Sequence, residues 1–172
     1  MDLSILHYLQ GIHHPILDFF MIIFTHLGDG GIIWILLSFF FLVKKETRVL
    51  GLTMVLGLIF CLLFGNLLIK NIVARPRPFH IHFDIPLIIK EPSGYSFPSG
   101  HTLASFTSVT ILYFYNKKWG KWAFLLALII GFSRMYHFVH YPTDVLAGMV
   151  LGYLLGRLSI KGIDYFLIKR GG

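Results

Sequence analysis

The sequence predicts an all-α integral membrane protein: a bundle of five transmembrane helices preceded by a helix that lies in the membrane interface. Of its 172 residues, 56% are hydrophobic and only 13% are charged, and the mean hydropathy is +0.74. Soluble domains carry about a quarter of charged residues, so this composition is typical of a chain that lies mostly in lipid. The apolar residues also gather in runs separated by short polar connections. At this length we expect one domain, residues 1–172.

Five apolar runs define the expected transmembrane helices: 31–43, 49–69, 102–115, 119–139 and 143–168. A span needs about 20 residues, or fewer where flanking charged side chains reach the headgroups. A sixth helix is expected if the weaker run 15–27 also spans, and residues 2–10 are predicted to form the interfacial helix. The Gly-Asp-Gly-Gly sequence at 28–31 interrupts the helical pattern. The connection 71–101 is long for a helix–helix turn, and long connections of this kind are usually functional.

Basic residues indicate how the helices cross the bilayer. They cluster in two connections and at the C-terminus: Lys44, Lys45, Arg48, Lys117, Lys118, Lys121, Lys169 and Arg170. With five spans these three places share one face, which the positive-inside rule makes cytoplasmic. The connection 71–101 and the turn 137–141 then lie on the extracytoplasmic face. We therefore expect a multi-pass protein of the plasma membrane, with the lipid bilayer as its surroundings.

The remaining bulk features restrict the partners. The net charge of +7 does not indicate nucleic acid, because the cations stand singly or in pairs between apolar runs. The single cysteine, Cys61, permits no intrachain disulfide. Gly148, Gly152 and Gly156 recur at every fourth position of the last apolar run, which predicts a face for close helix packing inside the bundle. The sequence does not determine an oligomeric state.

Three polar clusters stand at the expected extracytoplasmic ends of the helices: 70–78, 98–101 and 133–144. In the first, KNIVARPRP, Lys70 ends a helix and Arg77 lies in a stretch that two prolines keep extended. Arginine offers a planar fork to phosphate oxygens, and lysine offers a point charge on a flexible stem. The pair also fits ordinary cations that reach from a membrane end to the headgroups, and Arg75 fits that interpretation better than Arg77 does.

The second cluster, Pro-Ser-Gly-His at 98–101, precedes a helix that we expect to begin near Thr102. Free N–H groups and the positive end of the helix dipole meet there, which makes an anion site. Gly100 lets the backbone approach a ligand closely. Ser99 also fits a simple N-cap, whereas His101, beside an anion site, is suited to donate a proton.

The third cluster, SRMYHFVHYPTD at 133–144, places Arg134 and His140 before a helix that starts at Pro142. Asp144 stands one turn inside that helix, within reach of His140. A carboxylate on one ring nitrogen fixes the tautomer and leaves the other nitrogen free to attack. Alternatively, Asp144 satisfies the backbone of its own helix and the histidine is unrelated. We expect all three clusters to meet at one membrane face. This favours the interpretation as a catalytic site, because charges at a bilayer boundary are costly to desolvate.

A metal site is a weaker interpretation of the histidines. No pair of them has helical i, i+4 ligand spacing together with a carboxylate, and the neighbouring cations would repel a metal ion. We therefore expect neither a metal nor a cofactor.

At these residues the chain resembles a known family. K-x6-R-P, P-S-G-H and S-R-x5-H-x3-D, from Lys70 to Asp144, are similar to the three signature motifs of the type 2 phosphatidic acid phosphatase family of membrane lipid phosphatases. Every signature position is present and in order, whereas the flanking helices match only as hydrophobic runs. The length and the loop pattern look like those of the compact bacterial members.

The resemblance implies a role for each motif residue. His140 would be the nucleophile that forms a phosphohistidine, Asp144 would orient it, and His101 would protonate the leaving group. The phosphate oxygens would be held by the cations and by the start of the helix: Lys70, Arg77, Ser99, Gly100 and Arg134. Such a site stabilises the transition state by electrostatic preorganisation. Members of the family need no metal ion.

The implied activity is hydrolysis of a membrane lipid phosphate or lipid diphosphate at the outer face. Undecaprenyl diphosphate is the first candidate substrate, and phosphatidylglycerophosphate or the lipid A 1-phosphate are alternatives, because the signature binds phosphate and not the lipid tail. Specificity would lie in the loop 79–97 and in the groove between helices. Vanadate-dependent haloperoxidases are similar at this site but soluble. A non-enzymatic binder of lipid headgroups is the alternative from another class, and it would not require an oriented histidine.

Overall fold

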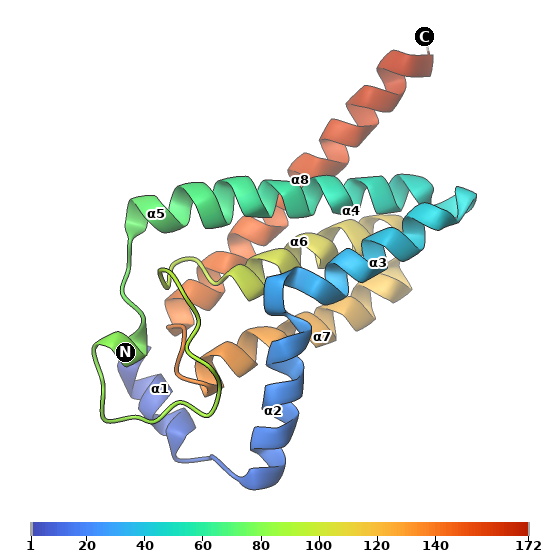
Figure 1. The fold of residues 1–172 in the computed structure, drawn as a ribbon. Coiled ribbons are helices and arrows are strands. Elements are labelled where there is room, and N and C mark those ends of the chain that lie inside the picture. The colour runs from blue at the N-terminus through green and yellow to red at the C-terminus, as the bar shows by residue number, and fades with distance from the viewer. Residues whose placement is uncertain (1, 172) are drawn as a thin grey trace.

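The computed structural model describes residues 2–171, without the side chain of Arg170, and its regular structure is entirely helical (Figure 1). The Arg170 side chain, expected to mark the cytoplasmic end, therefore lies outside the described part. The elements are, in order, α1 (Asp2–Gln10), α2 (Pro15–Leu27), η1 (Asp29–Gly31), α3 (Ile32–Val43), η2 (Lys45–Thr47), α4 (Arg48–Phe60), η3 (Cys61–Ile69), α5 (Lys70–Val73), η4 (Pro78–His80), α6 (Gly100–Tyr115), α7 (Lys117–Tyr136) and α8 (Pro142–Gly171). Each apolar run of the sequence is therefore helical, as expected.

Helix α6 lies at the centre of the bundle, between α4, α7 and α8 (Figure 1). Ten of its sixteen residues are buried. Several of these carry hydroxyl groups, and two of them have partners on other helices: the Trp34 indole donates to Ser105 Oγ at 2.9 Å, and Thr107 Oγ1 donates to the Gly152 carbonyl at 3.2 Å. The moderate hydropathy of this segment thus reflects contact with other helices rather than with lipid.

The glycines of α8 allow it to lie directly against α6. A Cβ atom on Gly152 would stand 2.8 Å from both the Leu103 carbonyl oxygen and Phe106 Cβ, and one on Gly156 would stand 2.7 Å from Thr110 Cβ. Real Cβ contacts of that length do not occur, so only glycine permits this approach. The predicted packing face inside the bundle is confirmed.

Lys70 lies near the end of one continuous helix, whose middle part is π-helical and therefore wider than an α-helix. Between α4 and α5 the backbone is π-helical over Cys61–Ile69, a form that is rare and occurs mostly at functional sites. Gly65 lets this segment approach α6, because a Cβ there would stand 2.0 Å from Leu103 Cδ2. Cys61 is buried against Thr107, with 3.1 Å between Sγ and Oγ1.

The N-terminal helix α1 packs beneath the loop that follows α5. Leu6 is fully buried in a second apolar cluster, together with residues of that loop and of the α7–α8 turn: Phe79, Phe138, Val139 and Tyr141. The sequence predicts the helix at 2–10 correctly, but not this contact with the loop. As a result α1 braces the end of the bundle where the three motifs lie (Figure 1).

Length and composition identify two candidate membrane spans in residues 2–171: Lys45–His80 and Pro142–Lys169. Helices α2 and α3 form a third if they count as one broken span, since their axes differ by 46°. At 1.5 Å per residue, the twelve residues of α3 reach about 18 Å, which is too short for a hydrocarbon core of about 30 Å. The run 31–43 is therefore too short to be a complete span by itself, contrary to expectation, and is a candidate span only in combination with α2.

The two ends of the bundle differ in charge. The basic α3–α4 and α6–α7 turns lie at one end, whereas the loop 74–99 and the α7–α8 turn lie at the other (Figure 1). Large apolar side chains are exposed along the outside of the helices, among them Leu36, Phe39, Leu67, Val150 and Leu154. An apolar surface of this extent suits a multi-pass membrane protein.

Candidate active site

The three sequence clusters meet around one cavity of about 700 Å³. Six of the eight candidate site residues line it: Lys70, Arg77, Gly100, His101, Arg134 and His140. Ser99 and Asp144 are fully buried and do not line it. A wider groove of about 920 Å³ lies between α6, α7 and α8, but its lining is mostly apolar and contains no histidine.

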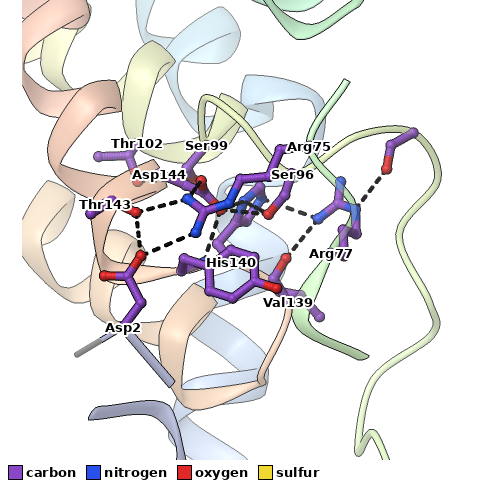
Figure 2. Close-up of polar contacts among 12 residues, drawn as sticks. Asp2, Arg75, Arg77, Ser96, Ser99, Thr102, Val139, His140, Thr143 and Asp144 are labelled. Carbon is purple, nitrogen blue, oxygen red and sulfur yellow. Dashed lines mark hydrogen bonds and ion pairs between the residues drawn. The ribbon is translucent and has the colours of Figure 1, made fainter. Parts of the chain in front are cut away.

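His140 is held between a carboxylate and an arginine (Figure 2). Its Nδ1 lies 3.5 Å from Asp144 Oδ2 and 3.4 Å from Ser96 Oγ, and its Nε2 lies 3.2 Å from Arg77 Nη1. Burial lowers the pKa of His140 well below its usual 6.5, and the proximity of Asp144 only partly opposes this. The imidazole is therefore neutral at pH 7. With the proton on Nδ1 beside Asp144, the Nε2 lone pair faces Arg77 in the cavity.

Asp144 is fully buried, and its carboxylate accepts hydrogen bonds from three other residues (Figure 2). Its Oδ1 accepts from Arg75 Nη1 at 2.7 Å, while its Oδ2 accepts from the Tyr141 backbone N–H at 2.9 Å and from the Ser96 hydroxyl. The predicted proximity of Asp144 to His140 is confirmed. The alternative of an aspartate that satisfies its own helix is also partly realised, because the Tyr141 N–H belongs to the turn before α8.

Arg75 is not a cation that merely reaches the headgroups, and that interpretation is wrong. Besides Asp144, its guanidinium donates to Thr143 Oγ1 at 2.7 Å and to Asp2 Oδ2 at 3.1 Å. Its planar group also lies 3.7 Å from the centre of the Tyr141 ring. Arg75 thus joins α1, the loop and α8 behind the cavity, a function that the bare motif spacing does not reveal.

The other three cations of the clusters have no carboxylate partner. Arg77 is buried and donates only to neutral groups: the carbonyls of Gly94, Val139 and Ser93, at 2.8 to 3.0 Å, and the ring of His140. Arg134 is buried too; it donates to the Thr25 hydroxyl, and its Nε lacks a partner in the described residues. Neither these arginines nor Lys70 forms an ion pair within the described residues. Burying unpaired charge is costly, so this cavity favours an anion.

The start of α6 forms the floor of the site. The helix begins at Gly100, two residues before the expected position, and the Ser99 side chain does not cap it. Instead Ser99 Oγ accepts from Thr102 Oγ1 at 3.0 Å, and the Ser99 N–H donates to the Asp144 carbonyl at 3.1 Å. A Cβ on Gly100 would stand 3.0 Å from Asn66 Oδ1, so glycine allows the close approach there.

His101 has a carboxylate partner of its own. Its Nε2 lies 2.9 Å from Asp29 Oδ1, in the break between α2 and α3. The ring also lies against Gly28, where a Cβ would stand 2.5 Å from His101 Cδ2. The Gly-Asp-Gly-Gly sequence at 28–31 predicts a helix break but contains no signal for this contact.

Besides the eight candidate residues, five others thus contact the site residues: Thr25, Asp29, Asn66, Arg75 and Ser96. Each acts on a motif residue that is far away in the sequence. Only Arg75 carries a usable signal, because it belongs to the same Arg-Pro-Arg-Pro stretch as Arg77. Among residues 2–171, no group of three or more His, Cys, Asp or Glu side chains is placed to hold a metal ion.

Comparison with known proteins gives a consistent result. The profile of the PAP2 superfamily matches residues 46–167. The undecaprenyl-diphosphatase of Sulfolobus acidocaldarius is 34% identical over 131 residues, which cover 75% of this chain and 63% of that protein. Undecaprenyl-diphosphatase BcrC of Bacillus subtilis is 30% identical over 156 residues, which cover 88% of this chain and 78% of that protein. The crystal structure of a transmembrane PAP2 type phosphatidylglycerolphosphate phosphatase from B. subtilis superposes with a TM-score of 0.76 at 31% identity, covering 95% of this chain and 84% of that one.

The contacts of Arg75 lead to a stability prediction. Replacing Arg75 by Met leaves the buried Asp144 carboxylate without its cation, so we expect a loss of about 2 kcal/mol; this is below the value for a fully buried pair because Arg75 is partly exposed. Thermal unfolding in detergent measures the change. Arg157→Met is the matched control, because Arg157 is exposed and has no ion-pair partner among the described residues. Equal shifts in Tm for the two variants would contradict the structural function of Arg75.

Proposed function

The chain belongs to the PAP2 superfamily of membrane lipid phosphatases, and on this premise we propose that it hydrolyses a lipid phosphate or lipid diphosphate, without a metal ion, through a phosphohistidine on His140. One observation carries the proposal: Lys70, Arg77 and Arg134 surround the neutral His140, whose Nδ1 faces Asp144, and within residues 2–169 none of the three cations is paired with a carboxylate. Such a cavity binds the three oxygens of a phosphoryl group and presents a nucleophile to its phosphorus.

In the proposed first step, the Nε2 lone pair of His140 attacks phosphorus and the bond to the leaving oxygen breaks. That oxygen takes a proton from His101. Asp144 stabilises the positive charge that develops on the His140 ring, and the three cations stabilise the negative charge on the equatorial oxygens.

In the proposed second step, a water molecule attacks phosphorus and the P–N bond breaks, which restores His140. The proton of that water passes to His101, and inorganic phosphate leaves. The Gly100 backbone and the start of α6 favour the anion throughout, because the positive end of the helix dipole points into the cavity. Ser99 contributes from behind the cavity wall, through its bond to the Asp144 carbonyl.

We propose five membrane crossings: α2 with α3, α4 through α5, α6, α7 and α8. The basic α3–α4 and α6–α7 turns then lie in the cytoplasm, by the positive-inside rule. The cavity lies at the opposite end, so it opens at the extracytoplasmic face of the plasma membrane, at the level of the lipid headgroups. The lipid tail would remain in the bilayer beside the helices.

Undecaprenyl diphosphate is the substrate that we propose first, because two of the compared relatives are named undecaprenyl-diphosphatases. Phosphatidylglycerophosphate is the second candidate, on the basis of the compared crystal structure. Lipid A 1-phosphate is the third. A lipid-headgroup binder would use the three cations but would not require the ordered contact between His140 and Asp144.

A phosphate-release assay tests the activity. In detergent with EDTA, the wild-type protein should release phosphate from undecaprenyl diphosphate, and faster than from phosphatidylglycerophosphate. His140→Asn should lower turnover by at least about a thousandfold, because it removes the nucleophile. His14→Asn, at an exposed histidine before α2 that does not line the cavity, is the control and should retain activity.

Two results would count against this mechanism: turnover that depends on added divalent ions, or a His140→Asn variant that folds like the wild type and keeps its rate. A preference for phosphatidylglycerophosphate would change the substrate but leave the mechanism intact.

Inhibition by anions tests the cavity itself. Orthovanadate and tungstate mimic the trigonal-bipyramidal phosphorus, so both should inhibit the wild-type protein. Lys70→Met and Arg134→Met should each weaken tungstate binding by about tenfold or more, since each removes a charge-assisted hydrogen bond. Isothermal titration of tungstate measures this, with Lys118→Met at the opposite end of the bundle as the control. Tungstate affinity that is the same in all four proteins would contradict an anion site at this place.

A further inference from the structure

The break between α2 and α3 brings a second carboxylate to the cavity. Asp29 lines the cavity and lies 2.9 Å from His101 Nε2, although 72 positions separate the two residues in the chain. Its other oxygen lies 2.7 Å from His26 Nδ1. Within the described residues, the Asp29 side chain forms no hydrogen bond to a backbone N–H, so it does not act as a helix cap. Its two carboxylate oxygens are directed to two histidines instead.

The site therefore contains two histidine–carboxylate pairs. In the first, Asp144 faces Nδ1 of His140 and Nε2 faces the cavity cation Arg77. In the second, Asp29 faces Nε2 of His101, and the Thr25 carbonyl is a further hydrogen-bond partner of that ring. The surroundings of the pairs differ: Asp144 is fully buried and paired with an arginine, whereas the Asp29 side chain is 53% exposed and meets only histidines. A carboxylate beside a histidine stabilises the protonated ring, which is the form required of a proton donor.

The α2–α3 segment holds this second pair in place by close contacts. Gly28 allows the backbone to lie against the His101 ring and against Ile130 of α7, since a Cβ there would stand 2.5 Å from His101 Cδ2 and 2.9 Å from Ile130 Cγ2. Three residues before Gly28, the Thr25 hydroxyl accepts from Arg134. One segment thus positions both His101 and a cavity cation, and it lies outside residues 46–167, where the family profile matches.

We propose that Asp29 is a positioning residue for the proton donor of the reaction, an inference that rests on the proposed function. Its carboxylate accepts the Nε2–H of His101, which fixes the ring and stabilises a second proton on Nδ1. When the bond from phosphorus to the leaving oxygen breaks, the Nδ1 proton passes to that oxygen, and Asp29 remains a carboxylate. His26 contacts Asp29 from the exposed side, and Arg134 is the cation that faces His101 from α7.

If Asp29 supports the proton donor, its loss should affect substrates according to their leaving group, whereas loss of a purely structural carboxylate should affect all substrates alike. The alcohol of a lipid phosphate monoester would leave as a strongly basic alkoxide and so requires a proton, whereas p-nitrophenolate leaves readily without one. Loss of the proton donor should therefore slow the hydrolysis of lipid phosphate monoesters much more than that of p-nitrophenyl phosphate.

The experiment compares both substrates on purified variants in detergent. Asp29→Asn keeps the shape of the side chain but removes its charge, and we expect kcat for phosphatidic acid to fall by about ten- to a hundredfold. For p-nitrophenyl phosphate we expect a fall of less than about threefold. Asp164→Asn is the matched control, because Asp164 is an exposed carboxylate of α8 that does not line the cavity; it should leave both rates unchanged.

A double variant shows whether Asp29 acts through His101. His101→Asn should itself lower the rate on phosphatidic acid, and adding Asp29→Asn to it should cause no further loss. Thermal unfolding of each variant reports on folding, and Gly28→Ala, which displaces the His101 ring while keeping Asp29, should reproduce the substrate dependence of Asp29→Asn.

Three results would overturn the assignment of Asp29: equal losses on both substrates, losses that multiply in the double variant, or a rate on phosphatidic acid that Asp29→Asn does not change. A wild-type protein without any phosphatase activity would instead refute the proposed function, so the two failures are distinguishable.

Discussion

The site depends on the burial of a single carboxylate. Asp144, in the first turn of α8, is wholly removed from solvent, and its charge must be compensated by groups from elsewhere in the chain. Arg75 supplies a cation, Ser96 a hydroxyl and the Tyr141 backbone an N–H, while His140 lies beside them. The Asp144 carbonyl, in turn, accepts the N–H of the residue before α6. One buried charge therefore fixes the loop, the α7–α8 turn and two helices relative to each other.

The pairing of the carboxylates explains why the cavity carries a net positive charge. Asp144 is neutralised by Arg75, and Asp29 is engaged by two histidines. Neither carboxylate is left to pair with Lys70, Arg77 or Arg134, so the positive charge of these groups is directed into the cavity. At the edge of a bilayer such charge is poorly solvated, and a phosphate headgroup relieves that cost. In the proposed mechanism, the neutral imidazole of His140 among these cations attacks phosphorus.

The sequence predicts much of this because a membrane restricts what a chain can do. Segments in lipid must be helical, and antiparallel helices with short connections bring every second connection to one end. That is why Lys70, Arg134 and His140 were expected together, and all three line the cavity. Asp29 and Ser96 could not be predicted in this way, since they reach their partners over 72 and 48 positions with no spacing rule between them. The Gly-Asp-Gly-Gly sequence does predict the break between α2 and α3, where Gly30 and Gly31 adopt positive φ angles, but hydropathy does not show that the two helices together have the length of one span.

The central claim is that the His140 imidazole attacks phosphorus. Rapid quenching of wild-type protein with substrate, followed by peptide mapping in a mass spectrometer under alkaline conditions, tests it most directly. We predict a phosphoryl group on His140 within the first turnover, stable to alkali and lost in acid. With p-nitrophenyl phosphate as substrate, the Asp29→Asn variant should form it as completely as the wild-type protein. A protein that turns over substrate while His140 remains unmodified at every time point, or that carries the phosphoryl group on another residue, would contradict the account.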